Sequence, residues 1–223
     1  LRRCSLVDVR GVGRATTLER LVLDDNPSLQ DIQGLAGLRS LKELVLSRTG
    51  VRDVGPLARM TALEELDLQS SQVSSVRLGD KPALRILRLG GSAISDLSGL
   101  RGCRVLETLE MTNTKSLLTT TSLPGLPSLR RISLQGSATV DLTGVGRQPA
   151  LRRLEFSRTP VSDISPLSGA RALEEVVFWK TPVTDAGVLL NLKRARLLYL
   201  PRGVSDDMME KLRREHPTAR IQR

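Results

Sequence analysis

The residues that could carry catalytic or metal chemistry are few and scattered. The chain of 223 residues has one histidine, His216, and two cysteines, Cys4 and Cys103. These three residues cannot complete a four-ligand zinc site. Gly11 and Gly13 lack the rest of a dinucleotide-binding fingerprint, and there is no Gly-rich phosphate loop followed by Lys-Ser/Thr. The sequence therefore predicts no enzyme, no metal site and no cofactor, and we expect His216 to be an exposed, solvated side chain.

Residues suited to recognition chemistry lie in the second half of the chain. Trp179 and Tyr199 are the only tryptophan and tyrosine, and two pairs of adjacent arginines occur at 130–131 and 152–153. Aromatic rings beside arginine are the commonest composition of a binding hot spot. Clustered guanidinium groups bind carboxylate or phosphate. The secondary-structure elements that position these side chains decide whether they share one surface.

A repeated Leu-x-x-Leu-x-Leu pattern indicates those elements. Successive copies are separated by 21 to 23 residues. The copies begin at Leu18, Leu41, Leu63, Leu84, Leu106, Leu129, Leu151, Leu173 and, more weakly, Ala195. A fixed period of this length is typical of a solenoid in which each copy is one structural unit. Each copy predicts one short strand with its leucines pointing into the core.

A second signature lies ten residues before each copy. These positions are Asp8, Asp31, Asp53, Ser74, Asp96, Thr119, Asp141, Asp163 and Asp185. An Asp directly before a short apolar segment is typical of a helix N-cap. The sequence therefore predicts a short 3₁₀ or helical turn in each repeat, on the side opposite the strands.

Together these motifs resemble the leucine-rich-repeat family over residues 1–216. The 22-residue length and the segment Val-Ser-Asp-Ile-Ser-Pro-Leu at 161–167 are similar to repeats of bacterial internalins and of a phosphatase regulatory subunit. The resemblance implies an α/β fold, a leucine-rich-repeat solenoid with a curved parallel β-sheet on the concave side and short turns on the convex side. The family usually has Asn at the ninth repeat position, which only Asn26 keeps here. Elsewhere a Thr or Ser hydroxyl is expected to bond to the turn more weakly.

The chain is expected to have two parts. Residues 1–204 form the solenoid, with about nine repeats of which the first is truncated, and residues 205–223 form a C-terminal helical cap. Ser205 is the expected N-cap of a helix from Asp206 to Glu215, Pro217 ends that helix, and Ile221 closes the sheet edge. The half repeat at the start of the sequence indicates an upstream domain.

The outward strand positions predict where a partner binds. Charges directly after the first leucine nearly alternate in sign along the stack, so most are expected to pair with neighbours. The exception in this column is Arg130 beside Arg152. In the next column Arg131 lies beside Arg153, and Glu155 and Glu175 relieve that repulsion only in part. The predicted partner-binding residues are Trp179, Tyr199, Val177, Leu197, Arg131, Arg153, Glu155, Arg158, Lys180 and Arg202. The alternatives are a solvated charged face and aromatic rings that pack against the cap.

Charge favours a protein partner. The formal net charge is +10, and residues 193–223 hold nine basic against four acidic side chains. The concave face is nonetheless expected to be acidic in the first repeats and basic in the last, which suits a protein better than a polyanion. The predicted function is protein–protein recognition, and the repeats resemble sensor domains of bacterial signalling and defence ATPases. Nucleic-acid binding through the basic C-terminal half and a purely structural spacer are the alternatives.

The sequence also predicts a location. No apolar run approaches the roughly 20 residues that a membrane span needs, so no membrane association is expected. Cys4 and Cys103 are 99 residues apart, too far for a disulfide in a stack of repeats, and unpaired cysteines are typical of a reducing compartment. We therefore expect a cytoplasmic protein, and the excess of arginine over lysine suggests a bacterial source.

Overall fold

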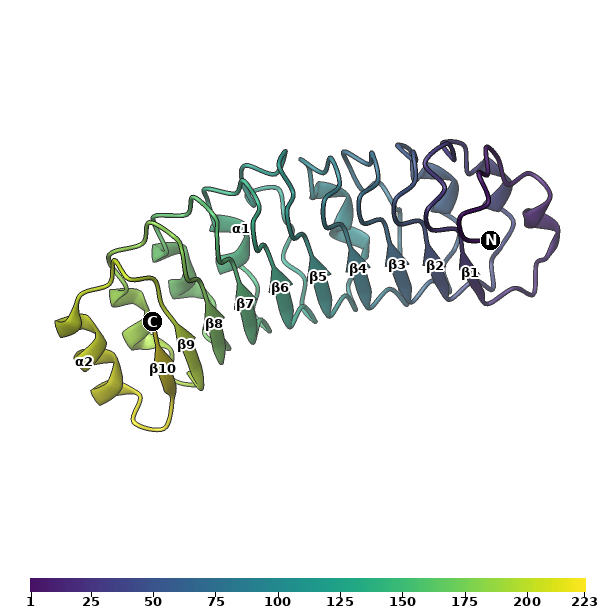
Figure 1. The fold of residues 1–223 in the computed structure, drawn as a ribbon. Helices are drawn as coiled ribbons and strands as arrows, with labels where there is room; N and C mark the ends of the chain where they lie inside the picture. Colours follow the sequence, from purple (N-terminus) through teal and green to yellow (C-terminus); the bar gives the residue numbers. More distant parts are fainter.

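Ten short parallel strands line one side of an elongated stack. The computed structural model describes residues 1–223, and its strands pair in sequence order from first to last. The strands are β1 (Arg20–Val22), β2 (Glu43–Val45), β3 (Glu65–Asp67), β4 (Ile86–Arg88), β5 (Thr108–Glu110), β6 (Arg131–Ser133), β7 (Arg153–Glu155), β8 (Glu175–Val177), β9 (Leu197–Tyr199) and β10 (Arg220–Gln222). The stack bends toward the strand side in its C-terminal half (Figure 1). The sequential parallel pairing of the strands confirms the predicted solenoid.

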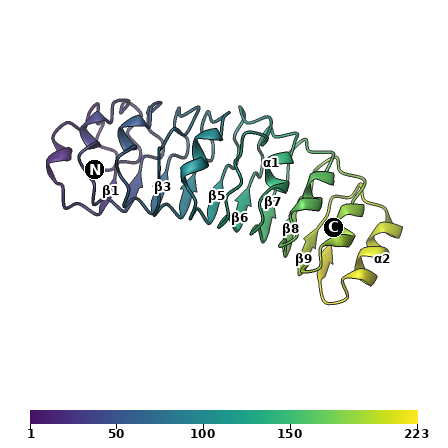
Figure 2. The same cartoon turned by 180° about the vertical axis from the view of Figure 1, so that it is seen from behind.

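Short helical segments line the other side of the stack. They are the 3₁₀ turns η1 (Val12–Arg14), η2 (Gln33–Leu35), η3 (Gly55–Leu57), η4 (Ser98–Gly102), η5 (Ser165–Gly169) and η6 (Gly187–Asn191), the single-turn α1 (Thr143–Gly146) and the longer α2 (Asp206–Glu215). Figure 2, seen from the opposite side, shows these segments on the side of the stack away from the strands, with α2 at the C-terminal end. None of the helices has the length and apolarity that crossing a membrane requires.

The regularly spaced aspartates make a different hydrogen bond from the one expected of an N-cap. Except for Asp8, each Asp lies one residue before the N-cap of its turn, and the cap residue itself makes no side-chain hydrogen bond. The carboxylate instead accepts a hydrogen bond from the backbone N–H two residues later, as Asp53 does from Gly55 at 2.8 Å and Asp163 from Ser165 at 2.8 Å. This is an Asx turn, which also fixes the start of the following 3₁₀ turn.

The two repeats without this Asp are also the two without a helical turn. No helical segment lies between β3 and β4 or between β5 and β6. In the first of these, Ser74 occupies the Asp position in the sequence repeat, but the residue that pairs with Asp96 is Ser75. In the second, Thr119 pairs with Asp141 and accepts a weaker hydrogen bond from Thr121 N–H at 3.2 Å. A helical turn therefore forms in the repeats that have the Asp carboxylate, and none forms in the two repeats that have a hydroxyl at this position.

The ninth repeat position bonds to the turn as expected. The Asn26 side-chain amide donates to the carbonyls of Leu23 and Asp24. Hydroxyls do the same job in later repeats, each donating to the carbonyl three residues earlier at 2.6–2.9 Å. They belong to Thr49, Ser92, Thr114, Thr159 and Thr181. In these five repeats a hydroxyl therefore replaces the asparagine amide as the donor to the turn, whereas Ser71 and Ser137 instead accept long hydrogen bonds from Val73 and Thr139 N–H.

The inward leucines stack in register along the whole molecule. Leu21 lies opposite Leu44, and Leu44 lies opposite Leu66 in the next pair. The buried apolar side chains form one continuous cluster of 58 residues, so no break divides the core. Cys103 belongs to this core, as predicted, and burial raises the pKa of its thiol to about 11. A thiol with such a pKa is unreactive at neutral pH.

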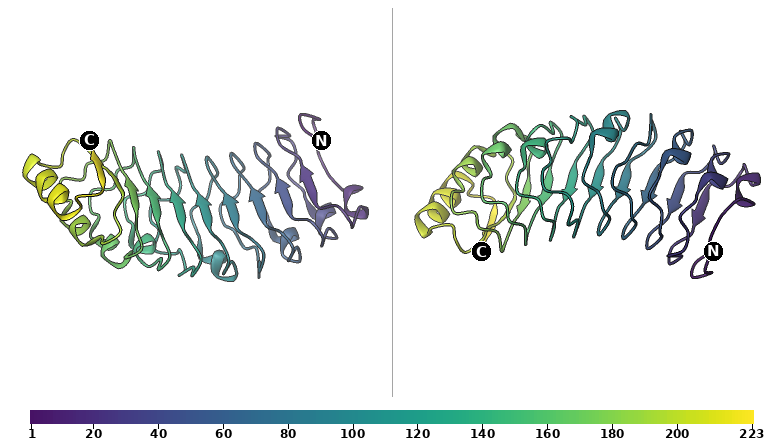
Figure 3. Two further views of the ribbon diagram at one scale, coloured as in Figure 1. Left: turned by 90° about the horizontal axis from the view of Figure 1, so that it is seen from below. Right: turned by 90° about the horizontal axis from the view of Figure 1, so that it is seen from above.

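The C-terminal cap forms as predicted, except at His216. Helix α2 spans Asp206–Glu215, and the Ser205 hydroxyl accepts a hydrogen bond from Met208 N–H at 3.2 Å. His216 was expected to be exposed, but it is buried, with Nε2 2.8 Å from the Leu189 carbonyl. The expectation was wrong because α2 packs against η6 and carries the ring into the interface. Strand β10 continues the sheet beyond β9 (Figure 3).

The close stacking of repeats gives a first testable prediction at Gly144 in α1. A Cβ at this position would lie 1.8 Å from the Thr120 carbonyl oxygen, whereas a Cβ at Gly125 would meet nothing within 4 Å. Gly→Ala inside a helix ordinarily stabilises, but here the backbone of the neighbouring repeat must move. We expect Gly144→Ala to lower the free energy of unfolding by about 1–3 kcal/mol.

The matched control for this prediction is Gly125→Ala, which we expect to leave the free energy of unfolding unchanged or to raise it by a few tenths of a kcal/mol. Urea unfolding followed by circular dichroism measures both. Equal midpoints for Gly144→Ala and Gly125→Ala would show that the repeats are not packed as closely as the structure has them.

Candidate functional site

The ten predicted binding residues lie on strands β6–β9 and on the turns that follow β7, β8 and β9. Arg131, Arg153 and Glu155 are half-buried strand residues, as are Val177, Leu197 and Tyr199. Trp179 is half-buried just beyond β8, and the remaining three, Arg158, Lys180 and Arg202, are exposed on the turns. The structure therefore brings all ten to one face of the C-terminal half.

Most charges on the rest of the concave face pair with a neighbouring strand. Lys42 Nζ lies 3.0 Å from a Glu19 carboxylate oxygen, and Arg85 lies 2.9 Å from Glu107. These are the alternating charges that the sequence analysis expected to pair, and that expectation is confirmed. Exposed pairs of this kind contribute about 0–1 kcal/mol each. Their consequence is that this part of the surface holds little uncompensated charge.

The acidic N-terminal end of the face is also compensated. Asp25 accepts hydrogen bonds from Arg48 and Arg3, and Asp24 forms ion pairs with Arg2 and Arg48. The hydrogen bonds from Arg48 lower the pKa of the Asp25 carboxyl to about 2. The acidic end expected from the sequence therefore carries its own arginines.

The arginines of β6 and β7 are only partly unpaired. Arg131 lies opposite Arg153 in the sheet, as the sequence indicated. Arg153 forms an ion pair with Glu175 at 2.8 Å, whereas Glu155, which was expected to help, forms no ion pair. Arg152 of the predicted four-arginine cluster is likewise paired, 3.5 Å from Glu174. Because Glu174 and Glu175 pair with Arg152 and Arg153, the arginines of this cluster without an acidic partner are Arg130 and Arg131.

Two cations lie over the ring system of Trp179. The guanidinium carbon of Arg158 lies 4.7 Å from the centre of a Trp179 ring, and Lys180 Nζ lies 5.1 Å from a ring centre. Both distances are within the range of cation–π attraction. Arg158 and Lys180 have φ of 57° and 55°, at the turn position where other repeats have Gly91 and Gly136. The turn itself therefore does not require these two residue types.

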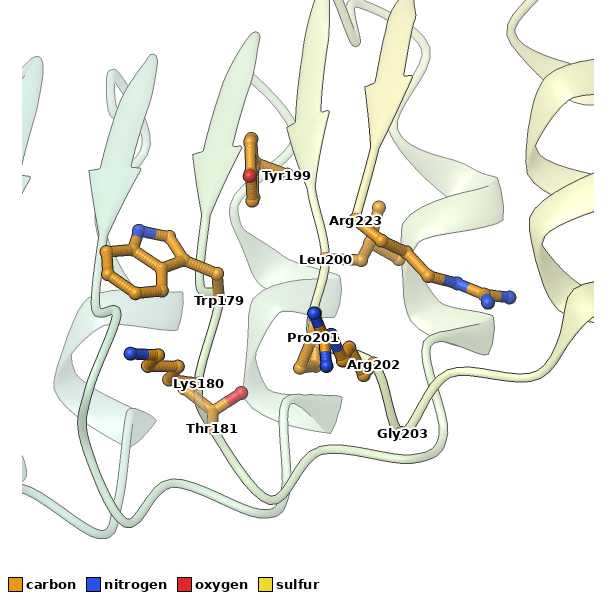
Figure 4. A pocket seen from close by; sticks show the side chains of 9 residues that line it. All are labelled: Trp179, Lys180, Thr181, Tyr199, Leu200, Pro201, Arg202, Gly203 and Arg223. Carbon is orange, nitrogen blue, oxygen red and sulfur yellow. The ribbon is translucent and has the colours of Figure 1, made fainter.

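A hollow of about 430 Å³ opens beside Trp179. Its lining comes from the ends of β8, β9 and β10 (Figure 4). The lining residues are Trp179, Lys180, Thr181, Tyr199, Leu200, Pro201, Arg202, Gly203 and Arg223. Four of the ten predicted residues line it, namely Trp179, Lys180, Tyr199 and Arg202. We call this space the aromatic hollow.

Pro201 and Arg223 were missed by the sequence analysis. Pro201 occupies the repeat position of Trp179, so the repeat alignment itself could have found it. Arg223 directly follows β10, whose sequence does not match the repeat and therefore gave no signal. Its guanidinium turns away from the hollow and forms an ion pair with Asp206 at 2.6 Å (Figure 4).

Three cations at the edge of the hollow have no acidic partner. Arg158, Lys180 and Arg202 occupy the same position in three successive repeats, and none of them forms an ion pair. We call these three residues the cationic rim. Helix α2 packs against η6 and β10, whereas Tyr199 lies opposite Gln222 of β10 in the sheet, so this ring borders the cap strand and not the cap helix. The arrangement offers exposed guanidinium and ammonium donors beside half-buried rings, and no group of His, Cys, Asp or Glu that could hold a metal ion.

No family model matches the sequence. Mouse nephrocan (Mus musculus) is 34% identical over 116 residues, which are 50% of this chain and 22% of nephrocan. An internalin, InlF of Listeria monocytogenes, superposes with a TM-score of 0.80 at 20% identity, over 96% of this chain and 66% of its own. A chain of the mouse RP105/MD-1 complex gives a TM-score of 0.77 at 19% identity, over 97% of this chain and 40% of its own. This chain thus spans less than two thirds of each.

Proposed function

Since the chain has the leucine-rich-repeat fold, we propose that it is a non-catalytic recognition module that binds a protein partner on its concave face. The observation that carries the proposal is the contrast within that face. Charges in the N-terminal half are mostly compensated within the protein, whereas the cationic rim and Trp179 are available at the C-terminal end. In this proposal the partner supplies the acidic groups that pair with the cationic rim.

The composition of this end supports a protein partner. Trp, Tyr and Arg are the residue types that dominate the energy of protein interfaces. Here they lie on adjacent strands of a continuous parallel sheet, so little backbone freedom is lost when a partner binds. One of the structural relatives, the RP105/MD-1 complex, is by its description an assembly of two proteins. The proposal therefore combines a suitable fold with a suitable surface.

The proposal includes a setting for the module. We place it in the cytoplasm, as the sensor part of a larger signalling or defence protein of bacterial origin. The resemblance of its repeats to such sensor domains supports this role, and two free cysteines are compatible with that compartment.

Ion pairs weaken the nucleic-acid alternative. A second group of cations lies before β9, at the strand ends opposite to the cationic rim. It consists of Lys193, Arg194 and Arg196. Lys193, however, lies 2.9 Å from Glu215, and Arg196 lies 3.6 Å from Glu174. A polyanion needs a continuous track of free cations, and these pairs interrupt it.

Affinity capture with matched variants tests the proposal. Wild-type protein, the double variant Trp179→Ala/Tyr199→Ala and the control Leu118→Ala/Val140→Ala are immobilised and compared. The control removes two large apolar side chains that are 59% and 53% exposed and lie outside the aromatic hollow. We expect a partner retained by wild type and control, and weakened at least about tenfold by the aromatic double variant, as for a hot-spot residue.

Circular dichroism and thermal unfolding must show all three proteins folded. Equal retention of the partner by all three would overturn the location of the site. A partner that nuclease treatment removes from all three would favour nucleic acid as the true ligand.

A further inference from the structure

We infer that the aromatic hollow and its cationic rim bind an acidic linear peptide, with an apolar side chain in the hollow and carboxylates on the rim. This inference rests on the proposed function and names the chemistry of the partner. Four features of the described residues carry it: the line of cations, their attachment to Trp179, the size of the hollow and the acidic residues around it.

The cations form a line across the strand ends. Arg158, Lys180 and Arg202 follow β7, β8 and β9, and neighbouring parallel strands are about 4.8 Å apart. Like charges at this spacing repel one another. Among the strand ends from β1 to β6, the only cation at this repeat position is Arg48, which follows β2 and is neutralised by two aspartates. The carboxylates of a ligand relieve this repulsion at the C-terminal end of the sheet, just as Asp24 and Asp25 neutralise Arg48 at the N-terminal end.

Trp179 prepositions two of the three cations. Arg158 and Lys180 lie at 4.7 and 5.1 Å from its ring centres, so part of their side-chain freedom is already lost. Ordering of long side chains opposes binding, and here the ring has ordered them before the ligand arrives. Neither cation forms an ion pair with the protein, so their hydrogen-bond donors remain free for a ligand.

The hollow is large enough for an apolar side chain and its neighbouring peptide backbone, and too small for a folded surface. Its volume of about 430 Å³ is at the low end for a ligand cleft. Trp179, Tyr199 and Pro201 supply apolar walls beside the charged rim. An extended peptide rises about 3.3 Å per residue, so three residues cover the roughly 10 Å from Arg158 to Arg202. One apolar residue flanked by acidic residues therefore fits both features.

Nearby carboxylates favour a peptide over a polynucleotide. Glu155 and Glu175 lie on β7 and β8, directly along the strands from the rim. A polynucleotide that continued over the sheet would bring phosphates close to both. A short peptide that crosses the strand ends at the rim avoids them.

Trp179 is the only tryptophan, so its fluorescence reports on this site alone. The probe is a synthetic peptide with Asp-Glu-Leu-Asp-Glu at its centre, titrated into the intact protein. We expect a saturable change in Trp179 fluorescence, an affinity that falls with added salt, and no change with the amide peptide Asn-Gln-Leu-Asn-Gln. Replacing the central Leu of the peptide by Gly is expected to weaken binding, because the hollow is then empty.

Two triple variants with the same change in charge separate the rim from general basicity. The variant Arg158→Gln/Lys180→Gln/Arg202→Gln is expected to weaken the peptide at least about tenfold. The control Arg77→Gln/Arg101→Gln/Arg104→Gln removes three exposed arginines around η4 and is expected to bind as wild type does.

Absence of a saturable change with the acidic peptide would overturn the inference, as would equal weakening by the two triple variants. Tighter binding of a single-stranded oligonucleotide of equal charge would also overturn it and assign the rim to polyanions. The proposed function can hold when this inference fails: if Trp179→Ala/Tyr199→Ala still loses its captured partner while the peptide does not bind, the site recognises a protein that is not acidic.

Discussion

Phe156→Ala is expected to lower the free energy of unfolding by about 3–5 kcal/mol. Phe156 and Phe178 replace inward leucines in adjacent repeats, and both are fully buried. Their rings stack with centroids 5.0 Å apart and an interplanar angle of 11°. Removing one ring leaves a cavity and deprives the other of its partner. The pair lies in the repeats that carry Arg158 and Trp179, so it also supports the site.

Urea unfolding measures this loss, and a double-mutant cycle with Phe178→Ala isolates the contact between the rings. We expect the cycle to give a coupling of about 0.5–1.5 kcal/mol. Phe156→Leu is the matched control, because leucine is the residue at this position in most repeats, and it should lose less than Phe156→Ala. A loss below 1 kcal/mol for Phe156→Ala would contradict the stacked, fully packed core.

Leu212→Asp is expected to release the C-terminal cap while the rest of the solenoid stays folded. Leu212 is fully buried where α2 meets the last repeat, with Met209 beside it. Burying a carboxylate there costs several kcal/mol, more than the few contacts that hold a single terminal helix. In a solenoid each unit contacts only its neighbours, so the end unfolds locally.

Amide hydrogen exchange resolves this expected pattern along the chain. In Leu212→Asp, we expect fast exchange in α2 and β10 and near-native protection from β2 to β7. The control Arg214→Asp places the same charge on the exposed side of the helix and should keep the cap protected. Uniform loss of protection over all repeats would mean that the solenoid unfolds as a single unit instead.

The fold followed from the sequence because the leucine period directly encodes strand stacking. A side chain that recurs every 21 to 23 residues in the same environment leaves one arrangement, and the structure has it from Leu21 to Leu198. The cap helix was also predictable, since Ser205 and the two aspartates after it are a complete N-terminal signal.

What sequence reasoning missed depends on contacts between repeats. Burial of His216 and of Lys81 is set by packing against another unit, not by residue type. Lys81 is fully buried in the column of Met60 and Cys103, with Nζ donating to the carbonyls of Ala58 and Leu78. Burial lowers the pKa of its ammonium group. Nothing in the local sequence marks that exchange of an apolar side chain for a charged one.

The site was only partly predictable for the same reason. Outward columns placed Trp179, Tyr199 and the three rim cations on one surface. The cation–π contacts and the hollow depend on turn geometry and on β10, which lies outside the repeat pattern. The sequence identified the surface, and the structure adds the hollow and the cation–π contacts from which we infer the chemistry of an occupant.

The central claim is that a partner docks at the C-terminal end of the concave face. Site-specific photo-crosslinking tests it most directly, with a crosslinking side chain placed in separate proteins at Tyr199, at Val45 and at Leu118. Val45 is on the same face in the N-terminal half, and Leu118 is exposed outside the sheet. We predict a crosslink to the captured partner from Tyr199 that greatly exceeds those from Val45 and Leu118. A crosslink of equal yield from Val45 or Leu118, or none from Tyr199 while the complex forms, would contradict it.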